Sequence, residues 1–333
     1  MGMDIARNIA HAARNLRSAD PDAERAYRLR PDEHVPDGIR RIARGQLYDA
    51  RDALDGAPSR RLGKAVHSTR KAIKRLRACV RLARDAIGEP TYERENTTLR
   101  TAARRISAPR DAEVLIETLD GLTERFAEEL PAGLTVTLRV QLGEDRDASL
   151  AALRNGGGAI TATLVSIDDV LARTPAWTFA QNGFDALSPG LDRTYRRGRK
   201  AMRAAQEDPT AEQLHAWRKR VKDLWHATEI VQSAQPKPLR RVAGQAHSLS
   251  GLLGDHHDLH VLRTYVEAHP QCFDDETSRQ ALVAVIDRRA TRLCEKALAR
   301  GRKLYAPKPK RFVRDVERGW KKRAAAAPKP TAG

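Results

Sequence analysis

A repeated arrangement of basic residues constrains the fold of this chain more than any other feature. The segments "VHSTRKAIKRL" from Val66 and "LHAWRKRVKDL" from Leu214 share the pattern His-x-x-Arg-Lys-x-x-Lys-x-Leu. Their first histidines, His67 and His215, are separated by almost half of the chain, which is too far for local composition to explain the likeness. The pattern therefore indicates an internal duplication.

Two further blocks recur in the same order and at nearly the same spacing. One lies upstream and contains two arginines, and the other lies downstream and pairs a basic residue with an aspartate. The matched positions are Arg41 with Arg193, Arg44 with Arg196, Arg110 with His257, and Asp111 with Asp258. This internal similarity predicts that the second half repeats the structure of the first, with about four helices in each half.

The spacing of residue types predicts which kind of secondary structure is repeated. Ala, Leu and Arg recur every three and four residues, whereas β-branched runs are few and the chain contains only 5 Phe. Such spacing favours helices over strands. We predict an all-α fold of two four-helix bundles related by a pseudo-twofold internal repeat. The expected helices cover residues 38–54, 60–87, 92–107, 110–128, 144–154, 160–173, 190–205, 210–233, 237–252, 257–268 and 276–305.

One segment resembles a strand. In "LTVTLRVQL" from Leu134, Val and Thr alternate as they do in strands. Leu134, Leu138 and Leu142 also recur every four residues, and a single strand would have no partner in an all-helical chain. We predict a helix here.

Loop signals divide the chain. The stretches "NGGG" from Asn155 and "TPAWTFAQNGFDALSPG" from Thr174 break the helical pattern, and the chain ends in Ala, Pro and Lys of low complexity. The predicted divisions are an N-terminal extension (1–25), a first helical half (26–175), a linker (176–189), a second helical half (190–305) and a basic, partly disordered tail (306–333).

The repeated cations share one face of each predicted helix. On a helical wheel, five cations that follow His67 on this helix lie within about 80° of it, and the apolar residues Val66, Ile73 and Leu76 lie on another side. We call these cations the first basic face: His67, Arg70, Lys71, Lys74, Arg77 and Arg81. The second basic face contains His215, Arg218, Lys219, Lys222 and His226.

A basic helix face is most often only a solvated surface. A face kept for solubility would mix signs and place Glu near Lys along the helix. The stretch from Val66 to Arg84 contains no carboxylate, and the same cations return in the second copy. Because stacked like charges destabilise a helix, binding of an anion is the better interpretation. A formal net charge of +18 agrees with an anionic partner.

These paired motifs, each followed by an Arg-Asp or His-Asp block, resemble the CHAD domain, the conserved histidine α-helical domain. The resemblance covers about residues 26–305, and it implies that basic faces from both halves line one groove that binds inorganic polyphosphate, with association with polyphosphate granules. The motif positions that correspond are His67, Arg70, Lys71, Lys74, Arg77, His215, Arg218, Lys219 and Lys222. The chain departs from the repeat at Asp223, Trp225 and His257.

Further binding residues are predicted from the recurring blocks, and these are Arg81, Arg41, Arg44, Arg110, Arg193, Arg196, His226 and His257. The two aspartates of the downstream blocks, Asp111 and Asp258, are expected to orient the cations rather than to contact phosphate. A polymer of phosphates suits this set, because Arg binds phosphate oxygens with two N–H groups and Lys supplies a mobile charge.

Nucleic-acid binding and phosphohydrolysis are the main alternatives to polyphosphate binding. A single-stranded nucleic acid calls for aromatic side chains between the cations, and only 5% of the chain is aromatic. A phosphohydrolase or a regulator that acts on short phosphorylated ligands is a further alternative. The triphosphate-tunnel hydrolase pattern Glu-x-Glu-x-Lys is broken at Thr97, and no Walker loop is present. We expect no catalysis and no cofactor.

The sequence argues against a metal site and against a membrane-spanning helix. The histidines of "GDHHDLH", His256 and His260, suit a metal site by spacing, but the first copy has Pro109 and Glu113 instead, so we expect no metal. The 3 Cys form no zinc or disulfide pattern, and no apolar run reaches the length of a membrane span. We expect a cytoplasmic monomer, with a dimer as the alternative.

Overall fold

The computed structural model describes residues 25–30, 33–155 and 158–326. Nearly all of the predicted N-terminal extension, and the tail beyond residue 326, lie outside the described residues. The helices are α3 (Val35–Leu54), α4 (Leu62–Leu82), α5 (Arg84–Ile87), α6 (Glu89–Arg105), α7 (Ala108–Arg125), α8 (Val136–Asn155), α9 (Ala159–Arg173), α10 (Ser188–Glu207), α11 (Ala211–Ile230), α12 (Pro236–Ala268), α13 (Glu276–Leu304) and α14 (Pro309–Ala326).

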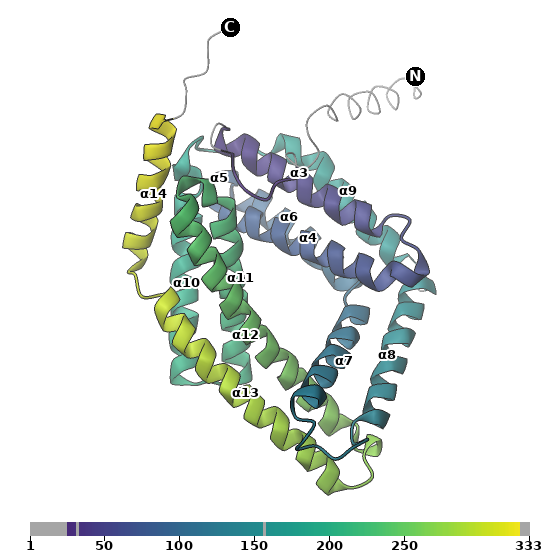
Figure 1. Ribbon diagram of the computed structural model, residues 1–333. Helices are drawn as coiled ribbons and strands as arrows, with labels where there is room; N and C mark the ends of the chain where they lie inside the picture. Colours follow the sequence, from purple (N-terminus) through teal and green to yellow (C-terminus); the bar gives the residue numbers. More distant parts are fainter. Residues whose placement is uncertain (1–24, 31–32, 156–157, 327–333) are drawn as a thin grey trace, which may run out of the picture.

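The predicted all-α fold is confirmed, and the part of the chain that the structure describes contains no strand (Figure 1). Most of the strand-like segment from Leu134 belongs to α8, where Leu138 and Leu142 are buried. The prediction of separate helices at 237–252 and 257–268 was wrong. These residues form one continuous helix of 33 residues, α12, because its leucines keep facing the core through the intervening glycines.

Each half contains four helices that pack in a closed circuit. In the first half, α3 packs against α4, α4 against α6, α6 against α9, and α9 against α3. In the second half, the circuit runs through α10, α11, α12 and α13. The predicted pseudo-twofold relation between the halves stays a prediction.

Two hydrophobic clusters join the halves. The larger cluster runs from Ile39 and Ile73 in the first half to Trp217 and Leu253 in the second. A second cluster packs α7 and α8 against the far ends of α12 and α13. Since residues from both halves build both clusters, the two halves form one continuous core, which fixes their basic faces relative to each other.

The basic tail begins with a helix that packs on the second half. On α14, Phe312, Val313 and Val316 are buried, and the Phe312 ring stacks on Tyr195 with 4.3 Å between ring centroids. Lys308 and Lys310, at the start of this segment, remain exposed. None of the described helices combines the length and apolar character needed to cross a lipid bilayer.

Candidate functional site: a basic centre between the halves

The candidate site lies where the two halves meet. Helices α4, α7, α12 and α11 follow one another around a circuit, because α4 packs against α7, α7 against α12, α12 against α11, and α11 against α4 (Figure 1). Two of these helices, α4 and α11, carry the two basic faces. The packing therefore brings together cations that are far apart in the sequence.

The amphipathic pattern of α4 orients its cations as the sequence predicts. Val66, Ile73 and Leu76 are each no more than 1% exposed, so burial of apolar surface holds that side of the helix in the core. His67, Lys71 and Lys74 are exposed on the opposite side. On α11, Leu214, Val221 and Leu224 are buried in the same way, which leaves Arg218, Lys219 and Lys222 in contact with solvent.

Three of these cations form what we call the basic centre: Lys74 from α4, and Arg218 and Lys222 from α11. Loss of hydration, together with the charges of Arg70 and Arg218, lowers the pKa of Lys74 to about 8. The pKa of Lys222 is lowered to about 8 by the same loss of hydration, followed by the charges of Arg218 and Lys74. Arg218 of the second half acts on Lys74, and Lys74 of the first half acts on Lys222, so the two halves share one field of positive charge.

The basic centre has no internal counter-charge. Among the described residues, no carboxylate forms an ion pair with Lys74, Arg218 or Lys222. The Arg218 Nε is buried and has no hydrogen-bond acceptor in the described part of the chain. A buried donor without an acceptor destabilises the folded protein, so the guanidinium of Arg218 is held in the basic centre at a cost in stability.

Gly254 on α12 makes room for this guanidinium. A Cβ atom at Gly254 would lie 3.2 Å from Arg218 Nη2, so a larger residue would push the arginine away. The close approach of the Arg218 guanidinium to Gly254 thus links α12 to the basic centre.

Two histidines border the basic centre. The rings of His215 and His257 lie 4.0 Å apart between centroids. The pKa of each is lowered to about 4, mainly through burial and then through neighbouring positive charge. His215 Nδ1 also lacks a hydrogen-bond partner among the described residues. Both rings are therefore neutral at pH 7, and each becomes a stronger donor if an anion favours its protonation.

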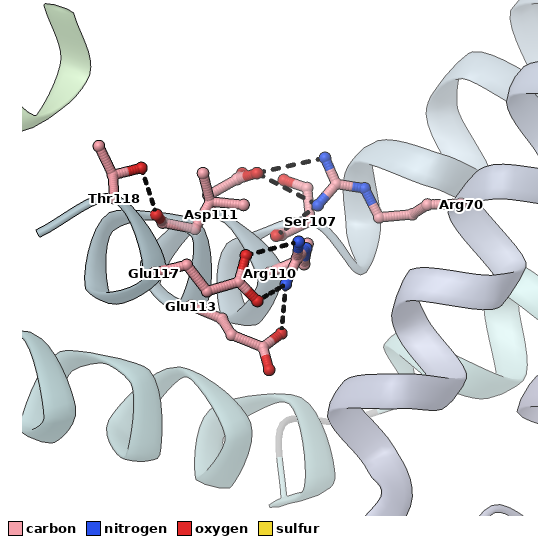
Figure 2. A network of polar contacts seen from close by, with 8 residues as sticks. Arg70, Ser107, Arg110, Asp111, Glu113, Glu117 and Thr118 are labelled. Atoms are coloured by element: carbon pink, nitrogen blue, oxygen red, sulfur yellow. Dashed lines mark hydrogen bonds and ion pairs between the residues drawn. The ribbon is translucent and has the colours of Figure 1, made fainter. Parts of the chain in front are cut away.

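Carboxylates hold two cations at the edge of the basic centre (Figure 2). Arg70 donates to Asp111 Oδ1 over 3.2 Å and to the Ser107 carbonyl over 2.8 Å. Asp111 thus contacts a cation of the first basic face, and its orienting role stays a prediction. Arg110 donates to Glu113 and Glu117 over 2.9 Å each, so two carboxylates offset its charge.

Asp258, the second predicted orienting residue, makes no ion pair within the described residues. Burial raises its pKa, and the charges of Arg218, Lys222 and Arg110 act against that rise. Asp258 therefore lies near the basic centre without neutralising it through direct contact.

The first basic face continues along α4 into a second group of cations. Arg77 donates to Asn96 Oδ1 over 3.0 Å, and burial together with the charges of Arg81 and Arg100 lowers its pKa to about 10. Arg81 forms an ion pair with Asp223, which also accepts a hydrogen bond from Arg220. Asp223, which departs from the basic repeat, thus joins α4 of the first half to α11 of the second half.

Sequence reasoning missed two members of this group, Arg197 and Arg220. Burial lowers the pKa of Arg197, and the charge of Arg220 lowers it further, so the two side chains lie close together. The only signal in the sequence was that each adjoins a predicted binding residue, Arg196 or Lys219.

Several predicted binding residues have structural contacts instead. Arg41 is 4% exposed and forms an ion pair with Glu33 at 2.6 Å, so it is a buried structural residue, contrary to the prediction. His226 is also buried, and its Nδ1 lies 3.0 Å from Glu229. It is likewise not part of an open groove. Both belong to amphipathic helices on which a basic or imidazole side chain can face inward when it has a partner.

The upstream arginines lie apart from the basic centre. Arg193 donates to Asp85 over 2.7 Å and to the Arg81 carbonyl over 3.1 Å, joining α10 to α5 and to the end of α4. Arg196 pairs with Asp192 on its own helix at 2.5 Å. Arg44 is half-buried on α3.

The histidines of α12 do not assemble a metal cluster. His256 is buried and His260 is exposed, and in the described part of the chain no group of three His, Cys, Asp or Glu side chains could hold a metal ion. Burial, followed by the charge of His260, lowers the pKa of His256.

The basic centre is expected to destabilise the free protein. A lysine whose pKa falls to about 8 in the folded state costs stability below pH 8, and this cost shrinks as the pH rises toward the ordinary lysine pKa of about 10.4. We expect the double variant Lys74→Met and Lys222→Met to unfold about 1–2 °C higher at pH 7, which corresponds to about 1 kcal/mol after discounting for solvent exposure. Thermal unfolding at pH 7 and pH 9.5 tests this, and an advantage that grows with pH would contradict it.

Comparison with known proteins places this arrangement in a family. Residues 41–267 match the family model described as the CHAD domain. The chain also resembles the crystal structure of the CHAD domain from the plant Ricinus communis, with 18% sequence identity, a TM-score of 0.63, and coverage of 85% of this chain and 95% of that chain. At this identity the likeness shows the fold alone. No curated protein matches the chain.

Proposed function

Because the chain belongs to the CHAD domain family, we propose that it binds inorganic polyphosphate across the basic centre. The observation that carries the proposal is the convergence of Lys74 from one half with Arg218 and Lys222 from the other, without a carboxylate partner among the described residues. Cations that repel one another in the free protein gain the most from a polyanion that contacts all of them.

The groups of the basic centre suit a phosphate chain. Polyphosphate offers acceptor oxygens and about one negative charge on each phosphate, with no bases to be read. Arg218, which is partly exposed, would donate to these oxygens with its planar guanidinium. Lys74 and Lys222 would add mobile charges that follow a flexible polymer.

The surrounding cations would extend the path that the polymer follows across the basic centre. Lys71 and Lys219 are exposed beside the basic centre on α4 and α11, and His67 stands next to Lys71 and Lys74. In the opposite direction, Arg77 and Arg81 would continue the path along α4. Arg70 and Arg110 are partly neutralised by their carboxylates, so we assign them a smaller share of the affinity.

The proposal is for binding without catalysis, and location at polyphosphate granules would follow from the same contacts. Titration calorimetry with long polyphosphate, pyrophosphate and single-stranded DNA at matched salt tests it. We expect the long polymer to bind most tightly, because only a chain can contact both halves at once. Equal affinity for pyrophosphate would indicate one compact site. Preference for DNA, or consumption of the polymer with Mg²⁺, would support the alternative functions instead.

Binding should strengthen as the pH falls. Bound polyphosphate favours the protonated forms of Lys74 and Lys222, whose pKa values in the free protein are about 8, so affinity declines as the pH rises above 8. The same polymer raises the pKa of His215 and His257 from about 4, so affinity increases in acid. Calorimetry in buffers of different ionisation enthalpy should show proton uptake at pH 8.5. An affinity unchanged between pH 6 and pH 9.5 would contradict this account.

A further inference from the structure

A cavity of about 360 Å³ lies between α7, α12 and α13, beside the basic centre. Its size is at the lower end for pockets that bind small organic molecules. Charged and apolar side chains share its wall, and its lining residues are Arg110, Val114, Glu117, Thr118, Gly121, Leu122, Arg125, Asp255, Asp258, Leu259, Arg289 and Leu293. Only Arg110 and Asp258 were part of the predicted polyphosphate site, so most of this wall has no role in the function proposed above.

Two arginines of the cavity lie close enough to interact electrostatically and have no direct counter-ion within the described residues. Burial lowers the pKa of Arg289, and the charge of Arg125 lowers it further, which shows that the two guanidinium groups repel each other. No carboxylate within the described residues forms an ion pair with either one. Asp255 moderates the positive charge of Arg289 from a greater distance. Two neighbouring guanidinium groups offer parallel N–H donors that match the oxygens of a dianionic phosphate.

The remaining wall is apolar. Leu122, Leu259 and Leu293 are buried members of the second hydrophobic cluster, and each also borders the cavity. Inorganic phosphate or polyphosphate would leave this surface unused. These leucines are at most 4% exposed, so the gain for an occupant with an apolar part comes from moving the ligand's own apolar surface out of water and against this wall.

Gly121 leaves the cavity open. It lies on the wall contributed by α7, and a Cβ atom placed there would meet nothing within 4 Å. Because its backbone is helical, a larger side chain at this position would extend into free space without strain.

We propose that this cavity is a second binding site, which takes a small organic phosphate monoester. The phosphate binds between Arg125 and Arg289, and the apolar part of the ligand rests on Leu122, Leu259 and Leu293. This site adjoins the basic centre, with Arg110 and Asp258 at the boundary, and goes beyond polyphosphate binding.

Phenyl phosphate is the probe for this site, and its binding is measured by calorimetry and by ³¹P line broadening. We expect phenyl phosphate to bind about tenfold more tightly than inorganic phosphate, and the double variant Arg125→Ala and Arg289→Ala to weaken it about tenfold or more. The matched control is Arg104→Ala with Arg302→Ala, which removes two exposed arginines elsewhere and should leave phenyl phosphate binding unchanged.

A second pair of variants tests the cavity itself. Gly121→Leu fills the space and should abolish phenyl phosphate binding, whereas Gly121→Ala adds one methyl group and should retain it. Phenyl phosphate binding that survives both Gly121→Leu and the arginine pair, or that equals inorganic phosphate binding, would overturn the proposal. Long polyphosphate is titrated into the same variants, because the cavity variants should keep its binding. The proposal for the cavity and the proposal for the basic centre can therefore be refuted independently of each other.

Discussion

Replacing Lys74, Arg218 and Lys222 with alanine should lower the affinity for long polyphosphate about 30-fold to 100-fold. Each charge-assisted hydrogen bond contributes about 1.5–3 kcal/mol, and exposure to solvent reduces that to less than half. Three such contacts give about 2–3 kcal/mol, where about 1.4 kcal/mol is a factor of ten. The fold should survive, because none of these residues belongs to either joining cluster.

A matched variant separates the basic centre from overall charge. Lys308, Lys310 and Lys322 are exposed near or on α14, and changing them to alanine removes the same three charges. We expect this variant to bind polyphosphate within about threefold of the parent. Equal losses in the two variants would mean that net charge alone explains the binding. Calorimetry at one fixed salt concentration makes the comparison.

Salt should weaken the complex steeply. Each phosphate contact on a single-stranded polyanion releases condensed counter-ions and adds about −0.7 to the slope of log affinity against log salt. With about five contacts, the affinity should fall about 100-fold between 50 and 200 mM salt. The variant that lacks Lys74, Arg218 and Lys222 should lose about 2 from the magnitude of this slope, since three contacts are gone.

The tail variant provides the control for salt as well. It should keep the parent slope, because its lysines are not expected to contact the polymer. A flat salt response in the parent protein would contradict an electrostatic site. A slope shared by all three proteins would show that the basic centre does not contact phosphate.

Local periodicity allowed part of this structure to be predicted. The inward side of α4, with Val66 and Ile73, and its outward side, with Lys74, follow directly from helical spacing. The contact between Asp111 and Arg70 was also predictable in kind, because a basic residue beside an aspartate recurs in both halves. These features depend on nearby residues or on the repeat.

The remaining features of the site depend on packing between residues that are far apart in the sequence. The partner of Arg41 is Glu33, which precedes its helix, and nothing in the helical pattern showed that this arginine faces inward. The neighbours of Lys74 come from α11, so its lowered pKa depends on how the halves dock. The cavity arginines, Arg125 and Arg289, lie on α7 and α13, which belong to different halves. Periodicity within one helix carries no information about such pairs.

Lysine footprinting tests the central claim most directly, because it reports on each half separately. Neutral amines react with acylating reagents, and the pKa values of about 8 for Lys74 and Lys222 make both reactive at pH 8. Mass spectrometry would follow their acylation with and without long polyphosphate, with Lys308 and Lys310 as internal references. We expect the polymer to protect Lys74 and Lys222 together while the tail lysines continue to react. Protection of only one of the two, or equal protection of the tail lysines, would contradict a shared site between the halves.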